Sequence, residues 1–149
     1  MPRAEKPKST CLVCSKKTAR SSYKYCSNAC QAKHQFLCYI EDWKKGKESG
    51  LRNTGVVGNH VKKYLRGKFG NKCCVCGWSK VNTKTGQVPL VADHIDGNWR
   101  NNIESNLRLI CPNCDSLSPT YAALNRGHGR KNRAISKRAG ENRLLTRNK

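Results

Sequence analysis

Paired cysteines constrain this chain more than any other feature of its sequence. Cysteine makes up ten of the 149 residues, and most of these cysteines stand in pairs separated by two or three residues. Four thiolates at such spacing suit a structural zinc ion, which replaces the core that a short polar segment is too small to build. We therefore predict two zinc sites, formed by Cys11, Cys14, Cys26 and Cys30 in the first and by Cys73, Cys76, Cys111 and Cys114 in the second.

The remaining cysteines and one histidine leave alternatives open. Cys74 lies between Cys73 and Cys76 and could displace Cys73, although two residues between ligands is the usual geometry and favours Cys73. His34 could replace a thiolate of the first group, but a lone histidine on a helix is more often a surface residue. Cys38 has no pair partner and is expected to be a small buried apolar residue.

The cellular compartment decides whether such cysteines bind metal or form disulfides. The first ten residues, MPRAEKPKST, are charged and lack the apolar segment of a secretory signal. The sequence has no apolar run long enough for a membrane-spanning helix. We expect a cytoplasmic protein, in which thiols stay reduced and cysteine pairs are metal ligands.

A large excess of positive charge indicates the class of partner. The chain has 30 lysines and arginines against nine aspartates and glutamates, a formal net charge of +21. This composition is typical of proteins that bind polyanions, with nucleic acid as the leading candidate. A membrane surface is disfavoured because no segment combines a long apolar face with a basic one. The candidate DNA contacts are Lys62, Lys63, Arg66, Arg100, Arg126, Arg130, Lys131 and Arg133.

Composition and periodicity divide the chain into four parts. We predict an N-terminal zinc-binding module over residues 1–38, a linker and basic amphipathic helix over 39–70, a second zinc-stabilised domain over 71–126 and a basic tail over 127–149. The helix is indicated by apolar residues that share one face, Val61, Tyr64, Leu65 and Phe69. Asn59 is its expected N-cap and Gly70 its expected end.

The few acidic residues are concentrated around the second cysteine group. Asp93, Asp96, Glu104 and Asp115 fall within 23 positions. The pattern QVPLVADHI predicts a strand ending at Asp93 and His94, DGN predicts a turn, and NLRLI predicts a second strand leading into Cys111. Pro112 suits the first turn of a helix. The expected fold is a small, zinc-stabilised α+β structure in which one zinc ion pins strand, loop, strand and helix.

The stretch from Cys73 to about Arg126 resembles the HNH nucleases, which have a ββα-metal fold. The matching features are the paired C-x2-C motifs, DHIDGN, NNIESNLRLICPNC and PTYAALNRG. The resemblance implies that His94 is the general base, that Asp93 is a ligand of a catalytic divalent ion, and that Asn106 fixes the loop orienting His94. The position after the second zinc cysteine supplies another ligand; it is commonly His or Asn in the family and is Asp115 here.

The implied chemistry agrees with the residue types. An imidazole with an ordinary pKa of about 6.5 can accept a proton from water at neutral pH. Carboxylates suit hard cations such as Mg²⁺ or Mn²⁺, and such an ion stabilises the charge that develops on a phosphodiester during hydrolysis. The resemblance further implies that the four-cysteine zinc is structural and that the products carry a 5′-phosphate and a 3′-hydroxyl.

Each of these residues also has a purely structural interpretation. Asp93 could cap a turn, His94 could be a spare zinc ligand, and Asn106 could be a turn residue. Asp115 could only complement the N-terminal dipole of its helix. Asp96 and Glu104 are interpreted as turn and surface residues.

Two functions follow from the sequence. The first is a metal-dependent DNA endonuclease, nicking or site-preferring, of the phage or mobile-element type that includes homing endonucleases; it would act in the host cytoplasm if phage-encoded. The alternative is a non-catalytic, zinc-containing nucleic-acid-binding protein. The combination of Asp93, His94 and Asn106 favours the enzyme, because binding alone does not need a base beside carboxylates. Both a monomer and a dimer are compatible with an active site that cuts one strand at a time.

Overall fold

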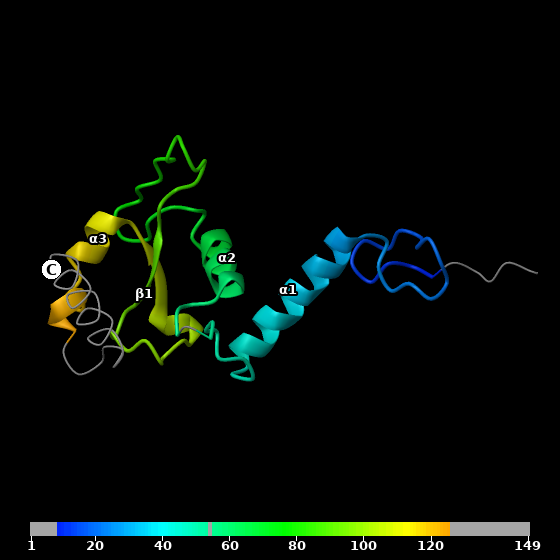
Figure 1. Cartoon of the computed structure of the whole chain (residues 1–149), viewed down its shortest axis with the longest axis horizontal. Coiled ribbons are helices and arrows are strands. Elements are labelled where there is room, and N and C mark those ends of the chain that lie inside the picture. The colour runs from blue at the N-terminus through cyan, green and yellow to red at the C-terminus, as the bar shows by residue number, and fades with distance from the viewer. Residues whose placement is uncertain (1–8, 54, 126–149) are drawn as a thin grey trace, which may run out of the picture. The chain divides into compact units, whose positions relative to one another are not determined.

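The chain divides into two units between Ser49 and Gly50. A computed structural model describes residues 9–53 and 55–125 (Figure 1). The first unit contains α1 (Asn28–Lys44), and the second contains α2 (Asn59–Lys68), β1 (Val91–His94), β2 (Leu107–Ile110) and α3 (Pro112–Ser116). Short 3-10 turns η1 (Glu104–Asn106) and η2 (Ala122–Leu124) complete the second unit. The expected α+β class with two cysteine groups is confirmed. No helix in the described part of the chain is long and apolar enough to cross a membrane.

The first unit consists of a cysteine-rich loop followed by one long helix. A bridge between Thr10 and Lys17 closes the first loop. Ser27 then caps α1, because its side chain accepts a hydrogen bond from the backbone N–H of Cys30. The helix continues to Lys44, beyond the module end expected at residue 38, so the predicted boundary falls inside a regular element. The four-part organisation as a whole stays a prediction.

Cys38 corrects one expectation from the sequence. Instead of being buried, its side chain is exposed on α1, with its sulfur 3.6 Å from Nδ1 of His34. The two residues are four apart and therefore lie on the same face of the helix. The buried residues of α1 are Ile40 and Trp43.

Backbone contacts of the second unit begin before α2, within the linker part of the predicted segment 39–70. Leu51 and Val57 form a bridge, and the N–H of Gly58 donates to the carbonyl of Gly50 at 2.7 Å. This bridge fixes how the chain approaches α2, so Gly58 is the N-cap and Asn59, expected at that position, is the first helical residue. Gly70 follows the C-cap with a φ of +60°, which agrees with its predicted role as a helix end.

An antiparallel hairpin of β1 and β2 is the centre of the second unit. The register pairs Val91 with Ile110 and His94 with Leu107. The first strand is shorter than the sequence pattern predicted, because Pro89 has no N–H to donate and Leu90 bends back to the carbonyl of Val88. In Figure 1 the hairpin lies between α2 and α3, and the contacts agree, with α2 against β2 and α3 against β1.

Burial is concentrated on β2 and on one side of α2. Val61 and Leu65 of α2 are inaccessible to solvent, as is Ile110 at the end of β2. Cys73, Ile110 and Cys111 form a small cluster against which Trp78 packs. The apolar core is thus continuous with the sulfurs of Cys73 and Cys111, and a metal bound at these sulfurs would extend the core.

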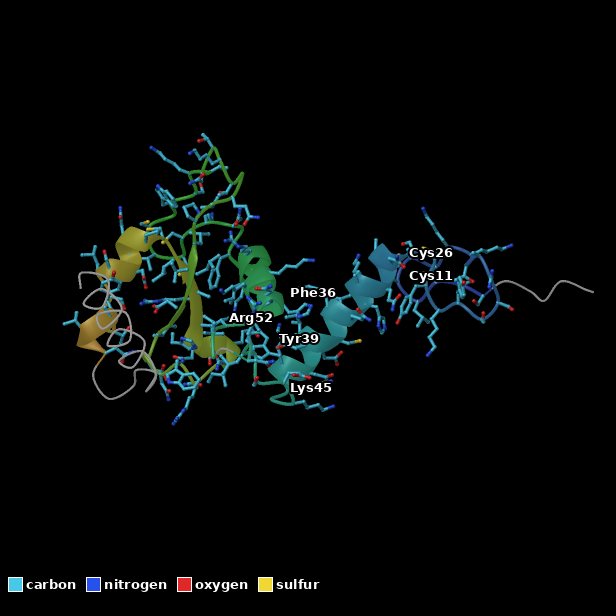
Figure 2. All side chains as sticks on the ribbon, in the orientation of Figure 1. Cys11, Cys26, Phe36, Tyr39, Lys45 and Arg52 are labelled. Atoms are coloured by element: carbon cyan, nitrogen blue, oxygen red, sulfur yellow. The ribbon has the colours of Figure 1, made fainter. Side chains whose placement is uncertain are left out.

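Both predicted cysteine groups are assembled. In each, the four Sγ atoms lie within 4.8 Å of one another. Sulfur–sulfur distances of 3.4 Å between Cys14 and Cys26 and 3.7 Å between Cys76 and Cys111 are too long for disulfide bonds. A tetrahedron with zinc–sulfur bonds of about 2.3 Å has edges of about 3.8 Å, so the spacing fits zinc. Figure 2 shows Cys11 and Cys26 beside each other at the start of α1. Cys74 is exposed and lies outside the second group.

In both groups, backbone N–H groups lower the pKa of the first cysteine and so favour its thiolate form. The backbone N–H of Val13 is the main group that lowers the pKa of Cys11, to about 6. Burial opposes ionisation of Cys73, but backbone N–H groups, led by that of Cys76 and including that of Val75, lower its pKa to about 6 as well. Such N–H groups stabilise the thiolate form that binds metal.

We predict that each purified chain contains two zinc ions, because each sulfur group has the spacing of a complete ligand set. Elemental analysis checks the stoichiometry. Cys73→Ser should lose one zinc ion and lower the melting temperature, since metal binding contributes directly to folding. The matched variant Cys74→Ser should keep both. A single zinc ion in the wild-type chain, or loss from the Cys74 variant alone, would contradict the assignment.

Candidate active site

Asp93 lies near the end of β1, the strand that contacts α3. Its Oδ2 accepts a hydrogen bond from Nε of Arg108 at 2.8 Å, and the two residues are direct partners in the strand register. Arg108 also donates from Nη2 to Oγ of Ser118 at 3.3 Å. The ion pair is largely buried, with side-chain exposures of 14% for Asp93 and 24% for Arg108. The strand register thus fixes the position of the carboxylate.

Asp115 brings a second carboxylate toward Asp93. It lies in the first turn of α3, which begins at Pro112 as the sequence predicted and has Cys111 as its N-cap. Burial raises the pKa of Asp115, the negative charge of Asp93 raises it further, and Arg108 opposes both effects. Two carboxylates and one guanidinium therefore form a coupled charge cluster between β1 and α3.

His94 faces the loop that connects the two strands. Its Nε2 lies 2.9 Å from Oδ1 of Asn102, a residue that is only 6% exposed. Asn102 in turn donates from Nδ2 to the carbonyls of Trp99 and Arg100, each at 3.1 Å. The half-buried imidazole is consequently held at the strand end by a side chain with several bonds of its own.

Asn106 holds the same loop from its other end. Its Oδ1 accepts from the N–H of Asp96, while its Nδ2 donates to Oδ1 of Asp96 and to the carbonyl of Asn101. The carbonyl of Asn106 also accepts from the N–H of Ile95, the residue after His94. The buried amide therefore joins both ends of the loop, and its role in orienting His94 stays a prediction.

Asp96 is more than the simple turn residue expected from the sequence. It accepts hydrogen bonds from the side chains of Asn101 and Asn106 and from the N–H of Asn98. Burial opposes ionisation of this carboxyl, but these bonds outweigh it and lower the pKa of Asp96 below its ordinary range. A negative charge at Asp96 therefore stabilises the loop beside His94.

Gly97 closes the loop against the C-terminal part of the described chain. Its φ is +72°, and a Cβ there would lie 2.8 Å from both Thr120 and Asn125. Nδ2 of Asn125 donates to the carbonyl of Gly97 at 2.6 Å. Only glycine combines this backbone conformation with so close an approach.

Glu104 also differs from its expected role as a surface residue. Its Oε1 accepts from the hydroxyl of Tyr64 at 2.6 Å and from Nζ of Lys68 at 2.7 Å. Because both donors lie on α2, the carboxylate ties the loop before β2 to that helix. The sequence carried one signal for this role, the scarcity of acidic residues. In a chain with only nine of them, a carboxylate is expected beside a cation or a hydrogen-bond donor.

Sequence reasoning missed Asn102, Arg108 and Ser118. Arg108 could have been found, since an antiparallel pair of one strand ending at His94 and one beginning at Leu107 places it opposite Asp93. Asn102 and Ser118 had no such signal, because their contacts depend on how the loops fold.

The predicted DNA contacts have different environments. Lys63 and Arg100 are exposed and Lys62 is half-buried. Arg66 instead donates to the carbonyl of Val88 and to the side chain of Asn71, so its guanidinium links α2 to the following loop. The four other residues, Arg126, Arg130, Lys131 and Arg133, lie outside the described residues. These contacts stay predictions.

The sequence matches one curated nuclease over part of its length. A stretch of 57 residues, 38% of the chain, is 46% identical to the H-N-H endonuclease F-TflIV of Escherichia phage T5. The match spans 24% of that protein's length. No protein-family model and no solved structure matches the chain. Over this stretch the chain is similar to an H-N-H endonuclease of a phage, and it spans about a quarter of that protein's length.

Proposed function

We propose that this chain is a metal-dependent DNA endonuclease that hydrolyses phosphodiester bonds one strand at a time. The observation that carries the proposal is the end of β1, where Asp93 faces the charge cluster with Asp115 and His94 is held by its own loop. We assign the segment from β1 to α3 to a ββα-metal core. The order of its elements and the match with the phage endonuclease support this assignment.

Asp93 and Asp115 are the proposed ligands of a catalytic Mg²⁺ or Mn²⁺. Burial raises the pKa of Asp115 and the negative charge of Asp93 raises it further, so a cation bound between the two carboxylates would relieve their repulsion. Carboxylate oxygens are also the donors that hard cations prefer. When bound, such an ion stabilises the charge developing on the phosphodiester oxygens.

His94 is the proposed general base, which takes a proton from the attacking water. Its ring is held at the strand end through Nε2, and Asn106 holds the loop that carries this contact. A base positioned in this way typically contributes about 10²–10⁴-fold to the rate. The water oxygen bonds to phosphorus as the phosphorus–oxygen bond to the 3′ oxygen breaks. The released 3′ oxygen takes up a proton from solvent, which leaves a 3′-hydroxyl and a 5′-phosphate.

The zinc ions have a structural role in this proposal. Four cysteine sulfurs complete a tetrahedron and leave no coordination position for water or substrate. The second group instead fixes Cys111 and therefore the start of α3, on which Asp115 lies.

DNA is the proposed partner. The net charge of +21 supports binding to a phosphate backbone, and the phage relative is named an endonuclease. Exposed Lys63 and Arg100, half-buried Lys62 and the basic residues beyond Asn125 are the proposed contacts. Arg100 lies with its guanidinium 5.2 Å from the ring centre of Trp99, which keeps this charge near the candidate site.

We predict that His94→Ala abolishes nicking of a supercoiled plasmid while DNA affinity stays within a few-fold. The expected loss in rate is about 10²–10⁴-fold, because the positioned base is removed. His60→Ala is the matched control, since it removes an exposed imidazole from α2. Wild-type nicking by the His94 variant would mean that another group is the general base.

We predict that Asp115 determines which divalent ion supports nicking. Asp115→Ala should lose most activity; Asp115→His should shift the preference toward Mn²⁺, Co²⁺ or Ni²⁺, because nitrogen ligands suit those ions. Asp115→Asn should raise the Mg²⁺ midpoint more than it lowers the rate at saturation, since it keeps an oxygen donor but loses charge. Metal titrations of the nicking rate measure all three variants.

Asp42→Asn, the same change on α1, is the control for these titrations. A residue that only complements the helix dipole would cost ~0.3–1 kcal/mol of stability when replaced and leave the metal midpoint alone. By contrast, we expect Asp115→Asn to melt no lower than wild type without divalent ions, because it relieves repulsion with Asp93. Wild-type midpoints in all three variants would remove Asp115 from the ligand set.

We predict that DNA binding depends steeply on salt and that residues 127–149 account for part of this dependence. The segment contains eight lysines and arginines and one glutamate. Each neutralised phosphate contributes about −0.9 to the slope of log K against log salt. Deleting the segment from the His94→Ala protein should flatten the slope, and replacing its eight basic residues with glutamine should have the same effect. An unchanged slope would mean that the segment does not contact the backbone.

A further inference from the structure

The bonds of Asn102 determine which way its side-chain amide faces. Nδ2 lies 3.1 Å from the carbonyl oxygens of both Trp99 and Arg100. Carbonyl oxygens only accept hydrogen bonds, so the group facing them must be the amide NH₂, which has two protons to donate. The reversed amide would place an oxygen against two oxygens at this distance. Oδ1 is therefore the atom that faces His94.

The orientation of the amide then determines the state of the imidazole. Oδ1 of Asn102 can only accept, and it lies 2.9 Å from Nε2 of His94. A hydrogen bond at this distance requires the proton to be on Nε2. In a neutral imidazole the proton on Nε2 leaves Nδ1 with the free electron pair.

We propose that Asn102 is a positioning residue that holds His94 in the Nε2–H tautomer and so presents Nδ1 as the proton-accepting atom of the general base. The inference deepens the proposed endonuclease function and rests on it for its catalytic consequence. Asn102 has the burial that this role needs, because at 6% exposure its amide is protected from competing water. Asn106 has a different role, since its bonds go to Asp96 and to Asn101 and secure the loop.

The chain provides a matched control one residue away. Asn101 also donates from its side-chain amide within the loop, to Oδ2 of Asp96 at 2.7 Å. It has no hydrogen bond to His94 among those of the described residues. Asn101→Ala therefore removes a loop-stabilising bond of similar kind, whereas Asn102→Ala also removes the acceptor for His94.

The direct test is the tautomer of His94, measured by nuclear magnetic resonance on the zinc-loaded full-length chain without added Mg²⁺. Long-range proton–nitrogen correlations at a pH of about 8 identify the protonated ring nitrogen of a neutral imidazole. The His94→Gln spectrum assigns the signals. In wild type and in Asn101→Ala, we expect the proton on Nε2 and slow exchange of this proton with solvent. In Asn102→Ala, we expect the protection of this proton from exchange to be lost. A proton on Nδ1 in wild type, or unchanged protection in Asn102→Ala, would overturn the inference.

Nicking kinetics supply the catalytic readout. Loss of the hydrogen-bond partner of a metal-bound histidine costs about 10–100-fold, and we expect a loss of the same order in kcat for Asn102→Ala, with KM for DNA within a few-fold. The double variant of His94→Ala and Asn102→Ala should be no slower than His94→Ala alone, because Asn102 acts through His94. A further loss in the double variant would show a general structural role instead.

Failure of this inference differs from failure of the proposed function. If wild type does not nick DNA with Mg²⁺ or Mn²⁺, the endonuclease proposal fails, and the resonance experiment still decides whether Asn102 sets the tautomer. If wild type nicks and Asn102→Ala keeps wild-type kcat, the positioning role is refuted while the endonuclease proposal stands.

Discussion

The second cysteine group is the constraint on which the rest of the candidate site depends. β1 and β2 have four residues each, which is too short for a two-stranded sheet to be stable alone. Sulfurs from residues 73–76 and 111–114 meet beside Ile110, where the last residue of β2 is buried. Because Cys111 is also the N-cap of α3, the same contact determines where the helix begins and how Asp115 approaches Asp93. The second cysteine group, the start of α3 and the position of the Asp115 carboxylate therefore depend on one another.

The acidic residues of this basic chain have distinct tasks within that unit. Asp93 and Asp115 form a charge cluster with Arg108, Asp96 stabilises the loop, and Glu104 joins the loop to α2. With a net charge of +21, the chain attracts polyanions but repels any divalent cation at long range. Screening by salt over about 10 Å limits that repulsion, whereas two nearby carboxylates act locally. Local acidity within a basic surface is what a metal-dependent enzyme acting on DNA needs.

The loop between the strands is stabilised by polar bonds rather than by an apolar core. Asn102 and Asn106 are buried, and both form several hydrogen bonds to loop backbone. In a low-dielectric environment such bonds strengthen, while an unpaired polar group would be costly. This loop therefore has a defined conformation, as the proposed role of His94 requires, even though most of its residues are polar.

The resemblance of the sequence to the HNH nucleases proposed Asp93, His94, Asn106 and Asp115 as the candidate site. The sequence alone determined the cysteine groups and the order of strands and helix. These features depend on spacing along the chain: two residues between cysteine ligands, alternation in a short strand, and proline at a helix start. The length of β1 and the cap of α2 were predicted less well, because backbone bonds at Leu90 and Gly58 decide them.

Only the tertiary structure decided which side chains meet across the hairpin and its loop. The pairing of Arg108 with Asp93 depends on strand register, and a slip of one residue would turn the arginine to the opposite face. The contact between Asn102 and His94 depends on a loop whose shape is set by hydrogen bonds among many polar residues. Sequence spacing specifies ligands that a metal gathers, because the metal imposes the geometry. It does not specify contacts whose geometry comes from the folded loop itself.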